Sequence, residues 1–136
     1  MEVTILLGSS SDMPVAEKCT KILKQFDVTY QLRVASAHRS PKFVEQIIHD
    51  AEADGCMVFI AMAGLAAALP GAVAALTTKP VIGVPCGGRV PFDSLLSIVQ
   101  LPPEFLRQLL VLTAGTMPAT WRSRCWHSRA KSMLQH

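Results

Sequence analysis

One run of the sequence limits the possible folds more than any other: every residue from Cys56 to Met62 is apolar. The run lacks the alternation of a half-exposed strand, so it indicates a strand that is buried on both faces. Strands of this kind are typical of parallel sheets that carry helices on either side. We therefore expect the chain to fold around a central parallel strand at this position.

Strand and helix patterns alternate on both sides of this run. Strands are expected at residues 3–7, 29–34, 56–62 and 81–84, and helices at residues 13–26, 41–53, 72–76 and 92–101. This order predicts right-handed crossovers and an open parallel sheet between helix layers. The expected fold class is α/β, a three-layer α/β/α sandwich around a parallel, flavodoxin-like (Rossmann-like) sheet.

The stretch Gly8-Ser-Ser-Ser-Asp-Met-Pro14 connects the first strand to the first helix. Pro14 suits the first turn of a helix, where its missing N–H would have no intrahelical partner, and Ser11 or Asp12 can cap that end. A helix start offers free N–H groups and a partial positive charge, which suit a phosphate. The stretch is neither a P-loop nor a G-x-G-x-x-G fingerprint, so a phosphate site and simple turn geometry both remain open.

Two more polar or glycine-containing loops, Ser36–Arg39 and Ala63-Gly64, follow the second and third strands. Ligands of parallel sheets lie beyond the carboxyl ends of the strands, so the three loops should converge on one pocket. A histidine such as His38 can give and take a proton near neutral pH, and Arg39 can bind a phosphate or carboxylate with two hydrogen bonds. The alternatives are a solvent-facing loop histidine and a surface ion pair.

The composition excludes several other classes of protein. The length of 136 residues suits one domain, and no apolar run is long and unbroken enough to span a bilayer. The N-terminus lacks the pattern of a secretory signal. Four scattered cysteines without a C-x-x-C pair indicate reduced thiols in a cytosolic protein, without a zinc site or a disulfide framework. Carboxylates near the loops are too few to hold a hard metal ion. His49 is expected at the surface.

Five segments in order resemble the N5-carboxyaminoimidazole ribonucleotide mutase (PurE) family of purine biosynthesis. They are Gly8–Asp12, Ser36–Pro41, Ala63-Gly64 with Leu69-Pro70-Gly71, Lys79–Pro85 and Asp93–Gln100. The resemblance extends through about residue 103. It implies a three-layer sandwich assembled as a homo-octamer, and a cytoplasmic enzyme that uses neither metal nor cofactor. Its partner is a small ribonucleotide, with no nucleic acid and no membrane.

The resemblance also implies roles for individual residues. His38 corresponds to the catalytic acid and base, and Ser9, Asp12 and Arg39 to the substrate-binding set. The implied site is further lined by Ser11, Ser36 and Ala37, with backbone N–H groups near Ala63 and Gly64. The implied reaction moves a carboxylate from N5 of the ribonucleotide to ring carbon C4 on the route to IMP. Alternatives are direct carboxylation of aminoimidazole ribonucleotide by CO2, as in a sister class, and a non-catalytic phosphate- or nucleotide-binding module.

Two parts of the chain depart from the family pattern. Leu65 and Ala68 stand where the family loop has a second glycine and a histidine. Residues 104–136 do not follow the family at all, yet plausible codons for them, shifted by one nucleotide, give G-I-P-P-A-T-V and a final amphipathic helix. We therefore expect a domain at 1–103 that lacks its usual last strand and helix, followed by an out-of-frame tail at 104–136.

The tail differs from the rest of the chain in charge. Residues 1–103 carry 8 Lys+Arg against 9 Asp+Glu, whereas residues 104–136 carry 5 against 1, together with Trp121 and Trp126. Basic and aromatic residues together also suit a nucleic-acid-binding segment, which is a further alternative. A shifted frame would produce this composition without any such function.

Overall fold

Strands and helices alternate along the chain in the computed structural model, which describes residues 1–87, 91–101 and 109–111. For residues 91–93 and 109–111 the description is confined to the backbone. The elements are β1 (Val3–Leu7), the 3-10 turn η1 (Ser10–Asp12), α1 (Met13–Gln25), β2 (Tyr30–Val34), α2 (Pro41–Ala53), β3 (Val58–Ala63), α3 (Ala68–Leu76), β4 (Val81–Pro85), α4 (Pro91–Val99) and β5 (Leu109–Val111).

The strands form one parallel sheet in the order β2-β1-β3-β4-β5. This is the flavodoxin-like order, in which the chain reverses its direction of winding after β2. The apolar run predicted to be central supplies β3, which pairs with both β1 and β4. The predicted α/β fold and its parallel sheet are confirmed.

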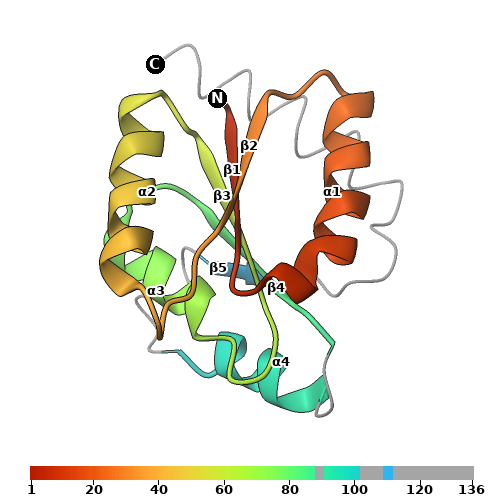
Figure 1. The fold of residues 1–136 in the computed structure, drawn as a ribbon, viewed down its shortest axis with the longest axis vertical. Coiled ribbons are helices and arrows are strands. Elements are labelled where there is room, and N and C mark those ends of the chain that lie inside the picture. The colour runs from red at the N-terminus through yellow and green to blue at the C-terminus, as the bar shows by residue number, and fades with distance from the viewer. Residues whose placement is uncertain (88–90, 102–108, 112–136) are drawn as a thin grey trace.

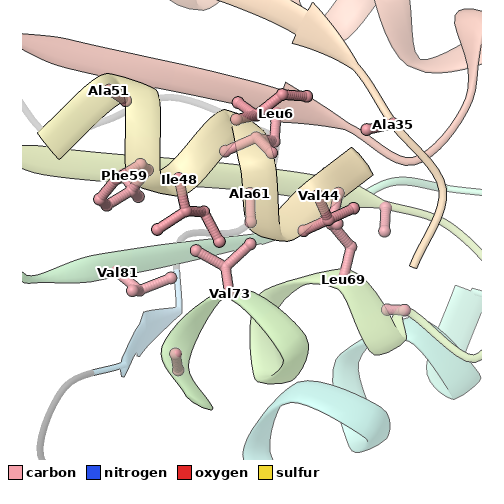
Figure 2. Packing of buried hydrophobic residues seen from close by; sticks show 14 of the residues in the cluster. Leu6, Ala35, Val44, Ile48, Ala51, Phe59, Ala61, Leu69, Val73 and Val81 are labelled. Atoms are coloured by element: carbon pink, nitrogen blue, oxygen red, sulfur yellow. The ribbon is translucent and has the colours of Figure 1, made fainter. Parts of the chain in front are cut away.

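Helices cover both faces of the sheet (Figure 1), and α1 lies on the opposite face from α2. Alternate residues of each buried strand point to alternate faces: Ile60 and Met62 join the cluster beneath α1, whereas Phe59 and Ala61 join the other. In that second cluster the strands pack against α2, α3 and α4, and Figure 2 shows Ile48 of α2 and Val73 of α3 among its members. The result is the three-layer arrangement that the sequence predicts.

Two details of the helices differ from the predictions. The α3 helix begins at Ala68 instead of residue 72, because Pro70 falls in its first turn, where a missing N–H leaves no intrahelical bond unmade. The helical spacing of α2 predicts that Phe43 faces the core with Val44, but Phe43 is 52% exposed. Its side chain lines an open groove beside the edge strand β2 instead of the sheet face.

The described sheet does not end at β4, whereas residues 1–103 are expected to lack the family's usual last strand. Residues Leu109–Val111 pair in parallel with Val81–Gly83 at the free edge of β4. Strand pairing joins backbone groups, so any apolar extended segment that reaches this edge can form it. The part of the chain where the last helix is expected to be missing lies outside the described residues. The same is true of Trp121, Trp126, Cys125, His127 and His136. In the described part of the chain, no helix has the length and apolar character needed to span a membrane.

Candidate functional site

The hydrogen bonding of the sheet continues past the carboxyl ends of its strands. Three backbone N–H groups donate to carbonyl oxygens of a neighbouring strand at this edge: Ala35 to Leu7 (2.8 Å), Gly8 to Met62 (2.9 Å) and Cys86 to Ala63 (2.8 Å). The first residues of the loops after β1, β2 and β4 are thereby tied to the sheet. They hold the loops side by side, as the strand order requires.

The loop after β1 is organised by reciprocal hydrogen bonds between Ser9 and the η1 turn. The Ser9 N–H donates to Asp12 Oδ2 (3.1 Å), and Ser9 Oγ accepts from the N–H (3.3 Å) and the hydroxyl (2.9 Å) of Ser11. This is a capping box. Asp12 occupies the N-cap position of α1 but makes no side-chain cap bond there. The predicted capping by Ser11 or Asp12 is therefore wrong, because the Asp12 carboxylate is engaged by Ser9.

The loop after β2 is a turn that Ser36 holds in place. The Ser36 hydroxyl oxygen accepts from the Arg39 N–H (3.3 Å), and the Ser36 carbonyl accepts from the N–H (2.9 Å) and hydroxyl (3.2 Å) of Ser40. His38 and Arg39 are exposed at the tip of this turn. A base and a cation are thus presented on a short, hydrogen-bonded connection immediately before α2.

The loop after β3 passes close to the end of β4 and contains unusual backbone angles. A Cβ atom at Gly64 would lie 3.3 Å from the Cys86 carbonyl oxygen, so this close approach favours glycine. Leu65 and Ala67 have φ angles of 50° and 33°, in the left-handed region that L-residues rarely adopt. Leu65 is also 65% exposed, so little burial compensates for its conformation.

The three loops converge on one pocket of about 480 Å³, as predicted. It is lined by the nine residues predicted for the site: Ser9, Ser11, Asp12, Ser36, Ala37, His38, Arg39, Ala63 and Gly64. Seven further lining residues were not among the predicted site residues: Gly8, Leu65, Ala66, Ala67, Ala68, Leu69 and Gly87. Gly8, Leu65, Ala66, Ala67 and Gly87 lie in the loops that follow strands, which was the signal that could have identified them, whereas Ala68 and Leu69 begin α3.

A larger groove of about 530 Å³ lies between β2 and α2. It contains none of the nine predicted residues, and its polar side chains do not come from the carboxyl-end loops. His49 of α2 is 83% exposed and lies 3.9 Å from Asp50, so its predicted surface position is confirmed. We take the smaller pocket as the candidate site because three loops meet there.

Burial changes the acidity of two groups at this end of the sheet. The pKa of Asp12 is raised by burial, although hydrogen bonds from the Ser9 N–H and the Cys86 thiol partly oppose the rise. The pKa of Cys86 is raised to about 12 by burial and by the negative charge of Asp12. Cys86 is therefore a protonated thiol at neutral pH. Within the described residues, no three His, Cys, Asp or Glu side chains cluster in a way that could hold a metal ion.

Comparison with known proteins gives a consistent picture. Residues 2–120 match the family model described as AIR carboxylase. Over 102 residues, or 74% of this chain, the sequence is 56% identical to the N5-carboxyaminoimidazole ribonucleotide mutase of Methanocaldococcus jannaschii, covering 63% of that protein. The corresponding enzyme of Pyrococcus abyssi is 50% identical over 104 residues, which are 75% of this chain and 60% of the relative. The chain thus spans less than two thirds of these curated relatives.

Solved structures agree with the sequence matches. A crystal structure of Treponema denticola PurE superposes with a TM-score of 0.79 at 29% identity, covering 98% of this chain and 84% of the other. A variant of Treponema denticola PurE2 gives a TM-score of 0.73 at 31% identity, with 82% and 72% of the two chains covered. The match to the family model, at residues 2–120, includes the strands of the sheet and the three loops that form the candidate site.

Proposed function

The chain belongs to the AIR carboxylase family, and from that premise we propose that it is an N5-carboxyaminoimidazole ribonucleotide mutase. The proposed reaction converts the N5-carboxylated ribonucleotide to its 4-carboxy isomer in the synthesis of IMP. The observation that carries the proposal is the convergence of all nine candidate residues on one pocket at the carboxyl end of the sheet. The proposed substrate is a small ribonucleotide, and no metal or cofactor takes part.

The loop after β1 is suited to the sugar and phosphate of the substrate. Ser9, Ser11 and Asp12 present hydroxyl and carboxylate groups on a turn that their own hydrogen bonds hold in place. Arg39 supplies a positive charge from the neighbouring loop, and a guanidinium can bind two oxygens of a phosphate or carboxylate at once. Groups positioned before binding lose little entropy when the substrate enters.

His38 is the proposed acid and base. In protonated form it gives a proton to N5, and the bond between N5 and the carboxyl carbon breaks to release CO2. Ring carbon C4 then attacks the CO2 carbon, and the neutral imidazole removes the C4 proton, so the histidine ends in its starting state. A single histidine placed between N5 and C4 can perform both transfers.

The loop after β3 is proposed to retain the CO2. Backbone N–H groups near Ala63 and Gly64 can stabilise a carboxylate oxygen, while Ala66, Ala67 and Leu69 give the same wall an apolar character. An apolar wall limits hydration of CO2 and its escape while the ring carbon attacks. Leu65 and Ala68 form this wall in place of the glycine and histidine of the family pattern, so no second histidine contributes here.

The replacement of His38 by Asn tests the proposal. We expect turnover of the N5-carboxylated substrate to fall by about 10²- to 10⁴-fold, because an amide cannot transfer the proton. His49→Asn is the matched control, since His49 is exposed and lies outside the pocket. Near-normal turnover by His38→Asn would contradict the proton-transfer role. Binding of the ribonucleotide by the unsubstituted protein without any turnover would favour the non-catalytic module.

Direct carboxylation is the second candidate function. The sequence is also 47% identical over 102 residues to a Candida glabrata protein named phosphoribosylaminoimidazole carboxylase, of which the match covers 18%. Two substrates distinguish the reactions. We expect the purified protein to convert the N5-carboxylated ribonucleotide without added bicarbonate. Product formation only from aminoimidazole ribonucleotide with CO2 would identify the carboxylase instead.

The assembly, the location and the tail belong to the same proposal. We expect a homo-octamer in the cytoplasm, and the mass of the protein in solution tests the assembly.

We further propose that residues 104–136 are read out of frame, a view supported by curated matches of 102 to 104 residues. The family model extends to residue 120, so the encoding DNA must decide. If no single-base change near the Pro103 codon restores the family pattern, this part of the proposal is wrong.

A further inference from the structure

Leu65 lies at the opening of the candidate pocket. Its side chain lines the pocket and is nevertheless 65% exposed, so it borders both the cavity and the solvent. The other leucine that lines the pocket, Leu69, is 2% exposed and belongs to the hydrophobic core. Among the described residues that line the pocket, Leu65 is therefore the large apolar side chain that folding leaves mostly uncovered.

The position of Leu65 is set by the backbone on either side of it. Gly64 approaches β4 so closely that a Cβ atom there would lie 3.3 Å from the Cys86 carbonyl oxygen. The Ala67 N–H donates to the Gly64 carbonyl at 3.0 Å, and Leu65 lies within the turn that this bond closes, with a φ angle of 50°. The turn is thus held at both ends, and Leu65 is presented at the pocket by a defined backbone.

Protein stability does not account for a leucine at this position. Glycine adopts a φ angle of 50° without steric cost, and a mostly exposed leucine gains little free energy from burial. Both considerations favour glycine, which is the residue of the family pattern at this point of the loop. A leucine that contributes little to folding contributes to binding when a ligand covers it.

The rest of the pocket indicates which part of a ligand Leu65 meets. Ser9, Asp12, His38 and Arg39 bring polar and charged groups from the loops after β1 and β2, and these groups suit a sugar, a phosphate and a proton transfer. The loop after β3 brings Leu65 together with alanines. An apolar side chain gains free energy when it covers the face of an uncharged ring, whereas covering a phosphate would remove water from a charge.

We propose that Leu65 is a specificity-determining residue, whose side chain packs against the aminoimidazole ring of the ribonucleotide and covers it from solvent. The proposal rests on the proposed function for the identity of that ring. The contact favours ligands that carry a flat, uncharged heteroaromatic ring on the ribose phosphate over ligands that consist of the sugar phosphate alone. It contributes affinity and takes no part in proton transfer.

Three substitutions separate the side chain of Leu65 from its backbone. Leu65→Ala keeps a Cβ atom at the left-handed position and removes the apolar surface beyond it. Leu65→Gly removes the same surface and also relieves the backbone. Leu65→Met restores a large apolar side chain. Leu76→Ala is the matched control, because Leu76 is also exposed, at 43%, but lies at the end of α3 outside the pocket.

The measurement is isothermal titration calorimetry of the full chain with aminoimidazole ribonucleotide and with ribose 5-phosphate, which lacks the ring. We expect Leu65→Ala and Leu65→Gly to weaken binding of the ribonucleotide by about fivefold to 20-fold, because the ring no longer buries the leucine surface. Binding of ribose 5-phosphate should stay within about twofold of the unsubstituted protein. Leu65→Met should bind the ribonucleotide within about threefold, and Leu76→Ala should match the unsubstituted protein for both ligands.

The outcomes keep the two proposals apart. Normal ribonucleotide affinity in both Leu65→Ala and Leu65→Gly overturns the ring contact and leaves the proposed function intact. Equal losses for the two ligands also overturn it, because the side chain would then support the shape of the loop. If the unsubstituted protein binds the ribonucleotide but does not turn over the N5-carboxylated substrate, the proposed function fails while the titrations still decide the contact. Circular dichroism checks folding, and Leu65→Gly decides the contact if Leu65→Ala does not fold.

Discussion

The loops after β1 and β3 line the same pocket but differ in how their backbones are held. In the loop after β1, Ser9 and Asp12 form reciprocal hydrogen bonds, and no residue of this loop has a positive φ angle. The loop after β3 has two residues, Leu65 and Ala67, in the left-handed region, and one internal backbone bond from the Ala67 N–H to the Gly64 carbonyl at 3.0 Å.

This difference separates two kinds of constraint on a binding site. The first loop is a relaxed structure in which hydrogen bonds fix the directions of the Ser9, Ser11 and Asp12 side chains. The second is held in a costly conformation by the elements on either side, β3 and α3, so the rest of the fold must supply the stabilisation. Of these two loops, the relaxed one thus brings polar side chains to the pocket, and the strained one contributes mainly apolar surface.

Among the tests of this comparison, we expect the largest effect, a loss of activity, when the carboxylate of the relaxed loop is replaced. Asp12→Asn should lower kcat/KM by about tenfold to 100-fold, because hydrogen bonds to a charged acceptor are replaced by bonds to a neutral amide. Steady-state kinetics measures the loss. Asp50→Asn is the control, since Asp50 is exposed on α2 and lies outside the pocket. Equal losses in the two variants would contradict a specific role for Asp12.

The next effect is a gain in stability, which we expect from a substitution in the strained loop. Leu65→Gly should stabilise the protein by about 0.5–1 kcal/mol, because a left-handed conformation costs an L-residue about 1–2 kcal/mol and glycine adds an entropic cost of about 0.5–1 kcal/mol. Urea unfolding measures the change. The neighbouring Ala66 has no positive φ, so Ala66→Gly should instead destabilise. Destabilisation by both variants would show that the loop is not strained at Leu65.

Removing the cap from the relaxed loop should have a modest effect on stability. Ser9→Ala leaves the N–H and hydroxyl of Ser11 without their common acceptor, and we expect a loss of about 0.5 kcal/mol because η1 is short. Thermal unfolding measures it, and Ser9→Thr should keep most of the stability. A stability gain in Ser9→Ala would contradict the capping arrangement.

The smallest effect concerns the dependence of stability on pH. The folded protein holds the pKa of Asp12 above its ordinary value of 3.8, so the folded state binds this proton more tightly than the unfolded state. The resulting stabilisation is present below pH 3.8 and is lost as the pH rises through the raised pKa. The stability of the unsubstituted protein relative to Asp12→Asn should therefore fall across this range in urea titrations. A relative stability that rises with pH would contradict a raised pKa of Asp12 in the folded protein.

Much of this arrangement follows from sequence patterns because those patterns are local. The apolar run that forms β3, and the polar loops that contain Asp12 and His38, predict both the sheet and the edge where the pocket lies. The left-handed angle of Leu65 was not predictable, because nothing in a leucine favours it and only the surrounding fold imposes it. The effect of the Asp12 charge on the pKa of the Cys86 thiol was also missed, since the two residues are far apart in the sequence.

The backbone bonds that extend the sheet beyond its strands have a mechanical consequence. The N–H groups of Gly8 and Cys86 donate to the carbonyl oxygens of Met62 and Ala63, both in β3, so the base of the pocket shares the hydrogen-bond ladder of the central strands. To deform that base, the protein would have to open part of its most protected region, which is energetically close to global unfolding. Motions that would admit a ligand are thus confined to the side chains and loop tips at the rim, while the base of the pocket keeps its shape.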